Sequence, residues 1–587
     1  MKLCVLRASV LKIIVLFFAF PFALFAQSHP PSFGGAGGGY RSPVDFPIGL
    51  SGTFGEPRTG HFHSGIDIRT QQAVGKKVYA IADGYVSRIS VSPGGYGKAL
   101  YITHSDGHTS VYGHLQGFNE TITKYVTAEQ YKNETFAINL TLEPSQIPVK
   151  KGEVVALSGN SGSSAGPHLH FEIRDTETEE PLNPQAFGFK VEDKIPPTLK
   201  ELRIIPKSPE TTIKSSEKPL NITLTGSGSK YKLTGGDTIR IAGKVSFAIL
   251  ATDQSTGSTS GNGVYSIALF IDKQEVFRQK MDRINFGNSR CAISAIDYAE
   301  FLATKKRFQT TEIQPGNTAQ IYEIGEERGI YTFDNQQSYE VKYEVSDFAG
   351  NKATLLFYVE GAEPPPDSKS SERDVNGYAI AWDERFDYVG EGIRFYGNAG
   401  VFFDDIIFRH SIEKQRPASA LAPVHVVGDP KIPMKTTATL IIKPDEETLQ
   451  KYDSSKLMVV SIDSKGGFSP QESVFQNGTI VAQVREMGRF TVAADTTPPV
   501  ITPVNISNGK KITAQKDIQV KISDNLSGIN TYTGKLNDKW ILMDYDRKNR
   551  LLTYTFDDRL QKGDNVFSLE VIDYAGNRSE IMMKLVY

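Results

Sequence analysis

The segment His168–Glu172 constrains the fold of this chain more than any other stretch. It reads His-Leu-His-Phe-Glu, so polar and apolar residues alternate. Side chains along a β-strand point to opposite faces in turn, which puts the two histidines and the glutamate on one face and the leucine and phenylalanine on the other. The two imidazoles then lie about 7 Å apart along the strand. The pattern predicts a strand with one face in a core and one face that presents polar groups.

A second polar cluster, His63-Ser64-Gly65-Ile66-Asp67, stands about a hundred residues earlier. A lone His-x-His pair is usually a surface or core pair. Here, however, seven of the ten histidines lie between His61 and His170. Catalytic zinc is bound by imidazole nitrogens and a carboxylate oxygen, with one position left to water. The two clusters together supply such a ligand set.

Seven short motifs follow one another between residues 54 and 172. They are Phe54-Gly55-Glu56, His63-Ser64-Gly65-Ile66-Asp67-Ile68, Ala82-Asp83-Gly84-Tyr85-Val86, Tyr112-Gly113-His114-Leu115, Lys150-Lys151-Gly152-Glu153-Val154-Val155, Gly159-Asn160-Ser161-Gly162 and Gly166-Pro167-His168-Leu169-His170-Phe171-Glu172. In identity, order and spacing they resemble the lysostaphin-type (LytM-like) zinc metallopeptidases. The resemblance covers roughly residues 42 to 188 and says nothing about the rest of the chain.

The resemblance implies one Zn²⁺ ion per chain and a role for each matched residue. The implied zinc ligands are His63, Asp67 and His170. The implied catalytic groups beside the metal are His114 and His168. No His-Glu-x-x-His helix is present, so a glutamate base is not expected, and Glu172 is assigned at most a supporting role on the strand of His170.

Three further histidines have no matching position in the family pattern. His104 is expected to end a strand and to pack beneath the site, and His61 and His108 are expected in loops. None of the three is predicted to bind the metal.

The catalytic module is predicted to span residues 42–190 as an antiparallel β-fold. Short alternating runs are separated by glycine turns, and no segment shows a convincing helical period. About thirty residues, Gln116 to Pro148, stand where simpler members of the family have a short connection. Their polar and aromatic content suggests a flap at the rim of the groove, which either sets substrate choice or obstructs access.

The first residues have the pattern of a secretory signal peptide. Residues 1–26 carry three basic residues and then an apolar run of about 14 residues, which is shorter than the ~20 that a spanning helix needs. Cleavage is therefore favoured over a retained anchor. Residues 27–41 form a glycine-rich tether. We expect an exported protein, periplasmic or secreted, with no membrane span after signal removal.

Length, charge and cysteine content set further bounds. A chain of 587 residues divides into several domains. The net charge of −2 becomes about −5 without the three basic leader residues, which gives no reason to expect a nucleic-acid partner. The two cysteines are Cys4 and Cys291. Cys4 belongs to the leader, so no intramolecular disulfide is expected and Cys291 is predicted to be buried.

The rest of the chain contains an internal repeat. Asp193-Lys194-Ile195-Pro196-Pro197 recurs as Asp495-Thr496-Thr497-Pro498-Pro499, and each copy ends in an Asp-x-Ala-Gly-Asn tip, at Asp347 and at Asp573. Both copies resemble bacterial immunoglobulin-like sandwiches, residues 194–362 with an insertion around Tyr298 to Tyr322, and residues 496–587. A linker at 363–375 and a β-sandwich of uncertain type at 376–495 separate them. A calcium site is one interpretation of the tip, but a turn with glycine at a positive φ explains the motif without metal.

The predicted fold class is therefore all-β, with a metallopeptidase domain followed by several β-sandwiches. The resemblance implies a zinc-dependent metalloendopeptidase that hydrolyses peptide cross-links of bacterial peptidoglycan. One alternative is a non-enzymatic scaffold or activator of cell-wall hydrolases that retains the fold, and another is a general secreted metalloprotease. The tail positions or regulates the enzyme and is a possible contact for an envelope protein partner.

Overall fold

The computed structural model describes residues 39–324, 328–363 and 377–587. The signal peptide at 1–26, most of the tether at 27–41 and nearly all of the linker at 363–375 lie outside the described residues. Among the described residues, none of the helices has the length and apolar character that crossing a membrane requires.

A nine-stranded sheet forms the centre of the catalytic module. In spatial order its strands are β1 (Leu50–Gly52), β4 (Ile66–Arg69), β13 (His168–Asp175), β8 (His108–Leu115), β7 (Lys98–His104), β6 (Gly84–Val91) and β10 (Ile138–Thr141), with β14 (Pro181–Leu182) beside β13 and β11 (Pro148–Val149) beside β6. A smaller sheet holds β5 (Lys77–Tyr79), β12 (Val154–Leu157) and β9 (Gly117–Phe118), and β2 (Pro57–Arg58) pairs with β3 (His61–Phe62). A short 3₁₀ turn, η1 (Pro184–Phe187), follows β14.

Strand β13 confirms the alternation predicted for His168–Glu172. Leu169, Phe171 and Ile173 have no exposed surface and belong to the main hydrophobic core. The opposite face carries His168, His170 and the residues that follow at the same spacing. The apolar side chains of β13 thus fix the strand in the core, and its polar side chains point to the opposite face, where they can form a site.

The expectation that the module lacks a helix is wrong. Helix α1 (Glu120–Lys132) lies within the Gln116–Pro148 insertion, begins at the cap residue Asn119 and buries Ile122 and Val126. The insertion also contributes a strand to the main sheet. Its strand β10 extends the edge of the sheet beyond β6, four strands away from β13, and α1 contacts the last sandwich.

The region after the module is a β-sandwich in which one long strand joins both layers. Strand β19 (Thr238–Thr252) pairs with β15 (Thr198–Pro206) through its second half and with β26 (Lys352–Gly361) through its first half. Between the halves, Gly243 has a φ of +97°, a conformation that glycine adopts without strain. The other elements are β16 (Thr212–Ile213), β17 (Leu220–Ser227), β18 (Lys230–Leu233), β20 (Ser266–Ile271), β21 (Gln274–Lys280), η2 (Phe286–Ile293), α2 (Tyr298–Thr304), β22 (Gln309–Thr310), β23 (Tyr322–Ile324), β24 (Ile330–Phe333) and β25 (Ser338–Ser346). Cys291 in η2 is buried, as predicted.

Residues 377–495 form two five-stranded sheets around a separate core. The first holds β28 (Phe386–Gly390), β29 (Ile393–Gly397), β33 (Ala438–Ile442), β37 (Thr479–Val484) and β36 (Glu472–Gln476). The second holds β31 (His410–Ile412), β32 (His425–Val427), β38 (Gly488–Ala494), β34 (Leu457–Ile462) and β35 (Phe468–Pro470). Strands β27 (Tyr378–Ile380) and β30 (Ile406–Phe408) pair alone, and α3 (Glu446–Lys451) and η3 (Ser454–Lys456) lie between β33 and β34.

The last sandwich has a four-stranded and a five-stranded sheet. The first contains β39 (Val500–Pro503), β41 (Asp517–Ser523), β45 (Leu551–Thr555) and β44 (Asp544–Asp546). The second contains β40 (Lys510–Lys511), β47 (Arg578–Val586), β46 (Asp564–Asp573), β42 (Ile529–Leu536) and β43 (Lys539–Trp540). Strands thus dominate every part of the described chain, and the all-β class is confirmed.

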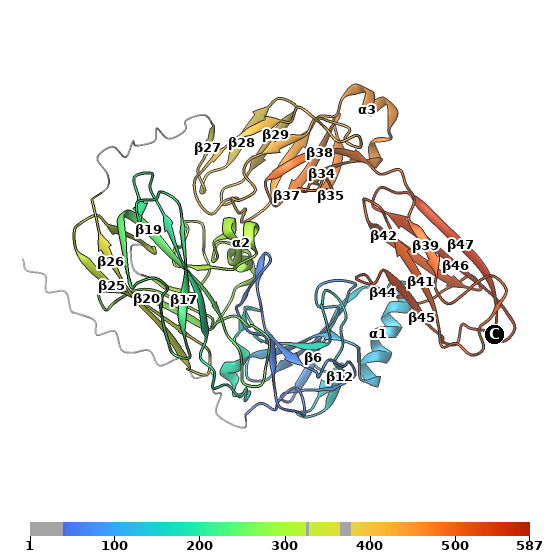
Figure 1. Cartoon of the computed structure of the whole chain (residues 1–587). Coiled ribbons are helices and arrows are strands. Elements are labelled where there is room, and N and C mark those ends of the chain that lie inside the picture. The colour runs from blue at the N-terminus through green and yellow to red at the C-terminus, as the bar shows by residue number, and fades with distance from the viewer. Residues whose placement is uncertain (1–38, 325–327, 364–376) are drawn as a thin grey trace, which may run out of the picture.

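The four regions close into a ring, because the last sandwich returns to the catalytic module (Figure 1). The rings of Tyr131 in α1 and Trp540 in β43 meet edge to face with centroids 5.2 Å apart. Lys98 forms an ion pair with Asp544 at 2.5 Å. Lys548 donates to backbone carbonyls of the Asn160–Ser164 turn. The last sandwich therefore rests on the turn that adjoins His114.

Candidate metal centre and neighbouring histidines

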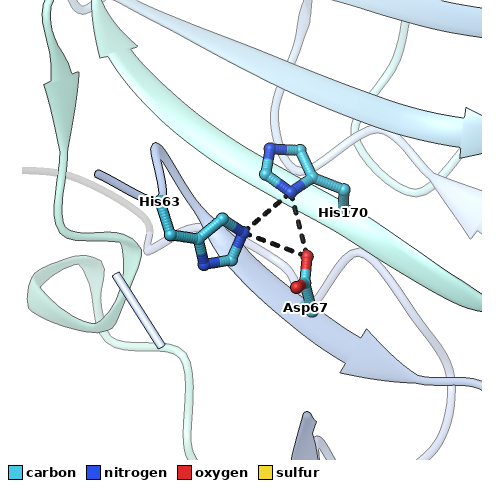
Figure 2. Close-up of side chains that lie close together, drawn as sticks. All are labelled: His63, Asp67 and His170. Atoms are coloured by element: carbon cyan, nitrogen blue, oxygen red, sulfur yellow. Dashed lines mark hydrogen bonds and ion pairs between the residues drawn. The ribbon is translucent and has the colours of Figure 1, made fainter. Parts of the chain in front are cut away.

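Sheet register brings two of the three predicted ligands together. His170 in β13 is paired directly with Asp67 in β4, and His63 lies in the turn just before β4. The ligand atoms of these side chains all lie within 4.8 Å of one another (Figure 2). Asp67 Oδ1 is 2.9 Å from His170 Nδ1 and 3.1 Å from His63 Nε2, and the two nitrogens are 3.1 Å apart. The two sequence clusters therefore converge as predicted.

The turn that delivers His63 depends on Gly65. A Cβ atom at this position would lie 2.3 Å from the carbonyl oxygen of Phe171 in β13. Only glycine lets the backbone approach the strand this closely. The glycine of the His-Ser-Gly-Ile-Asp motif is therefore required by packing against β13, whereas the histidine and the aspartate supply candidate ligands.

Each of the three side chains is held in place through its other polar atom. His63 Nδ1 donates to the carbonyl of Thr53 at 2.8 Å, Asp67 Oδ2 accepts from Arg58 Nη2 at 2.6 Å, and His170 Nε2 donates to Glu172 Oε1 at 2.8 Å. Such outer contacts fix the tautomer and orientation of metal ligands. The atoms left to face one another are one nitrogen of each histidine and one oxygen of the aspartate.

Glu172 is the centre of a buried network behind His170. Its Oε1 accepts from Ser64 Oγ at 2.6 Å and from Tyr96 Oη at 2.5 Å, and its Oε2 accepts from Arg174 Nε at 2.6 Å. The supporting role predicted for Glu172 matches these contacts. Sequence reasoning missed Arg174, although it continues the same period-2 pattern, and it missed Tyr96, which lies in a glycine-rich turn. Arg58 was also missed, and no signal in the sequence distinguishes it.

The charges of the cluster stabilise one another. Burial opposes ionisation of Asp67, but His63 and hydrogen bonds from His168 and His170 hold its pKa well below the usual range. Burial likewise disfavours charge on His170, yet Asp67 and Glu172 raise its pKa to about 9. The pKa of Glu172 is lowered despite burial, because Arg174 and His170 lie beside it. The cluster thus combines opposite charges in a water-poor site.

His114 and His168 lie side by side next to this cluster. Their ring centroids are 4.8 Å apart, and His168 Nε2 is 3.3 Å from Asp67 Oδ1. Nδ1 of His114 donates to the carbonyl of Ser161 at 3.0 Å, and Nδ1 of His168 donates to that of Gly166 at 2.8 Å. Each ring therefore keeps Nε2 for other partners. Both residues are partly exposed, whereas the three candidate ligands are buried.

The backbone and the pKa of His114 are both unusual. Its φ is +57°, which is uncommon for a residue with a Cβ atom and often marks a functional position. Burial, followed by the nearby His170 and His168, lowers its pKa to about 3. His114 is therefore a neutral imidazole at pH 7.

The other three histidines of the module lie outside the cluster. His104 ends β7, is buried, and bonds to the Asp83 carbonyl at 3.0 Å and to Ser110 Oγ at 2.8 Å. His61 and His108 are not in loops as expected, because they are the first residues of β3 and β8.

The donor set fits zinc. Two imidazole nitrogens and one carboxylate oxygen are the ligands of many catalytic zinc sites, and each has the outer partner that such ligands require. His63, Asp67 and His170 would hold the ion.

The sequence of this module is similar to that of known peptidases. The model of peptidase family M23 matches residues 61–131 and 137–184. Lipoprotein NlpD of Yersinia enterocolitica is 31% identical over 100 residues, which are 17% of this chain and 78% of that protein. The chain belongs to peptidase family M23. DD-carboxypeptidase/endopeptidase Mpg of Neisseria meningitidis serogroup B is 33% identical over 126 residues. These residues are 22% of this chain and only 23% of that relative's length.

Among solved structures, the catalytic domain of the M23 protein EnpA from Enterococcus faecalis is similar at 25% identity with a TM-score of 0.19. The match covers 25% of this M23 chain and 96% of that domain. A separate model, the Zu5-like domain, matches residues 377–495. This match gives a type to the sandwich that the sequence left uncertain.

Proposed function

We propose that the chain is an exported, zinc-dependent metalloendopeptidase that hydrolyses peptide cross-links of bacterial peptidoglycan. The observation that carries the proposal is the convergence of His63, Asp67 and His170 beside two oriented imidazoles. The name of the Neisseria relative, a DD-carboxypeptidase/endopeptidase, supports this class of substrate.

His63, Asp67 and His170 would hold a zinc ion, which would act as a Lewis acid that polarises a carbonyl group and makes water more acidic. The protein's own contribution is to keep the ligands fixed. Arg58 and Glu172 hold the outer atoms of Asp67 and His170, so their inner atoms keep one orientation. The apolar face of β13 keeps the strand itself in place.

His114 and His168 handle the proton in this proposal. Each donates Nδ1–H to a backbone carbonyl, which leaves Nε2 as the atom that exchanges protons with the reactants. One Nε2 accepts the proton of the attacking water, and the imidazolium that forms stabilises the developing oxyanion and then protonates the leaving amine. Because both rings are partly exposed, the peptide approaches the site from their side.

The experiment is mass spectrometry of fragments released from purified peptidoglycan by the mature chain. The wild-type chain with zinc should release peptides cut at cross-links, and a chelator should stop the release. His61→Ala is the matched control, because His61 is exposed and lies outside the cluster. It should cut like wild type, whereas His170→Ala should not cut.

Two variations of this assay, one with a second hydrolase and one with a protein substrate, separate the alternatives. A chain that releases no fragments but stimulates a second cell-wall hydrolase would favour the scaffold. Cleavage of an elastin-like protein in preference to peptidoglycan would favour a general secreted protease. Either result would refute the proposed function.

A further inference from the structure

Three aspartates converge at the junction between the catalytic module and the first sandwich. Asp193 lies in the segment that enters the sandwich, Asp253 follows β19, and Asp347 follows β25. One carboxylate oxygen from each lies within 4.8 Å of the others. Two oxygen ligands on opposite sides of a calcium ion are at most about 5 Å apart, because each Ca–O distance is about 2.3–2.6 Å. The spacing therefore fits a single ion.

The same place contains a small cavity lined by neutral polar groups without partners. The cavity has a volume of about 20 Å³ and is lined by all three aspartates together with Ser255 and Asn262. Ser255 and Asn262 are each only 3% exposed. The hydroxyl of Ser255 and both side-chain polar atoms of Asn262 lack hydrogen-bond partners, as does Asp253 Oδ1. Buried polar groups are normally paired, so these groups indicate a missing ligand.

The electrostatics of the cluster point to a cation. Burial, together with the charges of Asp347 and Asp193, raises the pKa of Asp253 to about 7. The pKa values of Asp193 and Asp347 are raised as well, mainly by burial. Three carboxylates that repel one another in a buried cavity are stabilised as anions by a bound positive charge.

The last sandwich repeats the arrangement. Asp495, Asp524 and Asp573 also bring one oxygen each within 4.8 Å of the others. Asp253 and Asp524 occupy corresponding positions in the two sandwiches. Asp253 follows Thr252, the last residue of β19, which pairs with the first residue of β15. Asp524 follows Ser523, the last residue of β41, which pairs with the first residue of β39. Ser527 is 9% exposed, its backbone N–H donates to Asp495 Oδ2 at 2.8 Å, and its hydroxyl has no partner.

We propose that each of the two sandwiches binds one divalent cation of the calcium class through its three aspartates. All the candidate donors are oxygen atoms, which suit calcium, whereas zinc prefers nitrogen and sulfur. The Asp-x-Ala-Gly-Asn tip is indeed a turn, with Gly350 and Gly576 at φ of +92° and +75°. The interpretation that it needs no metal is revised, because its aspartate meets carboxylates from two other segments.

The positions of the two sites give the cation a structural task. Asp193 and Asp495 belong to the segments that connect each sandwich to the preceding region, so a bound ion ties the connection to the sandwich. At the first site, the loop between Asp253 and Asn262 leads to Gly263. The Gly263 carbonyl accepts from Thr53 Oγ1 at 2.9 Å, and its N–H donates to Glu56 Oε2 at 3.1 Å. The cation thus orders a loop that contacts two residues of the module.

The test is calcium binding by the zinc-loaded mature chain in buffer otherwise free of divalent cations. Calorimetry with CaCl₂ from about 0.01 to 10 mM covers the affinity range of extracellular calcium modules. The wild-type chain should bind about two ions, as the two clusters require, and its melting temperature should rise with calcium. Asp253→Asn and Asp524→Asn should each bind one ion fewer, and the double variant should bind neither ion. Asp237→Asn and Asp564→Asn, at exposed positions of the same sandwiches, are the matched controls and should bind like wild type.

Stability without calcium distinguishes a lost ligand from a damaged fold. Asp253→Asn removes one of three repelling charges, so in calcium-free buffer near pH 7 it should melt at or above the wild-type temperature. The proposal is overturned if the wild-type chain binds no calcium. It is also overturned if Asp253→Asn melts lower than wild type without calcium and keeps the full calcium-induced shift. This inference does not depend on hydrolysis.

Discussion

The mixed cluster of His63, Asp67 and His170 and the aspartate cluster of the first sandwich differ in their electrostatics. In the first, His63 and His170 surround Asp67, and the carboxylate pKa falls well below its usual range. In the second, Asp253 is buried beside Asp347 and Asp193, and burial together with these two charges raises its pKa to about 7. In both clusters the ligand atoms lie within 4.8 Å of one another. Mixed charges therefore stabilise one another, whereas neighbouring carboxylates destabilise one another unless a proton or a cation neutralises them.

Replacing a ligand in the mixed cluster should have the largest effect. His170→Ala and Asp67→Ala should each lose zinc and reduce hydrolysis to the level of the chelated wild-type chain. Zinc content by elemental analysis and fragment release from peptidoglycan measure the two losses. If either variant keeps one zinc ion per chain, the replaced side chain is not a zinc ligand and the assignment of the mixed cluster as the metal site is wrong.

Replacing the two neighbouring imidazoles should separate metal binding from proton transfer. His114→Ala and His168→Ala should retain about one zinc ion per chain, because neither belongs to the ligand cluster. Their turnover should fall by about 10²–10⁴-fold, the usual contribution of general acid–base catalysis. Unchanged turnover in both variants, or loss of zinc in either, would contradict the assigned roles.

The outer support of the mixed cluster should matter less for hydrolysis than the catalytic groups. Glu172→Gln keeps the shape of the side chain but removes the charge that pairs with His170 and the buried Arg174. Zinc affinity should weaken by about 10–100-fold, and the melting temperature should fall because Arg174 loses its counter-ion. Glu177→Gln, an exposed residue in the following turn, is the control. Equal zinc affinity in the two variants would show that Glu172 does not support His170.

Sequence reasoning succeeded where local pattern determines position. The alternation in β13 fixes which side chains leave the core, and the linked motifs locate His63 and Asp67. Helix α1 was missed because its third buried position is Gln130, which weakens the apolar period, although Asn119 and Glu120 are a helix-start signal. The aspartate clusters were missed because three distant segments meet only through tertiary packing.

The pH dependence of stability should reveal the like-charge cluster directly. The pKa of Asp253 has its ordinary value of 3.8 in the unfolded chain and is raised to about 7 in the folded chain. The folded state then holds an extra proton between these values, so calcium-free stability should fall as pH rises from about 4 to about 7. Asp193 and Asp347 supply the repelling charges. Urea unfolding at several pH values gives the free energy of unfolding of the wild-type chain and of Asp253→Asn. Subtracting the Asp253→Asn curve from the wild-type curve removes the contribution of the other titrating groups. Parallel curves would contradict the raised pKa.

The smallest effect should come from the contact that joins the two clusters. A Cβ atom at Gly263 would lie 2.4 Å from Glu56 Cβ, so Gly263→Ala must displace Glu56. Glu56 Oε1 accepts from Arg58 Nη2 at 2.7 Å, and the same nitrogen donates to Asp67 Oδ2 at 2.6 Å. Because the change reaches the ligand through two side chains, kcat/KM should fall by less than about 10-fold, below the loss for a direct partner of a ligand. Gly261→Ala is the control, since a Cβ there meets only Thr252 at an ordinary 3.9 Å. If the two variants hydrolyse equally well, the loop does not position Arg58 and the two clusters act independently.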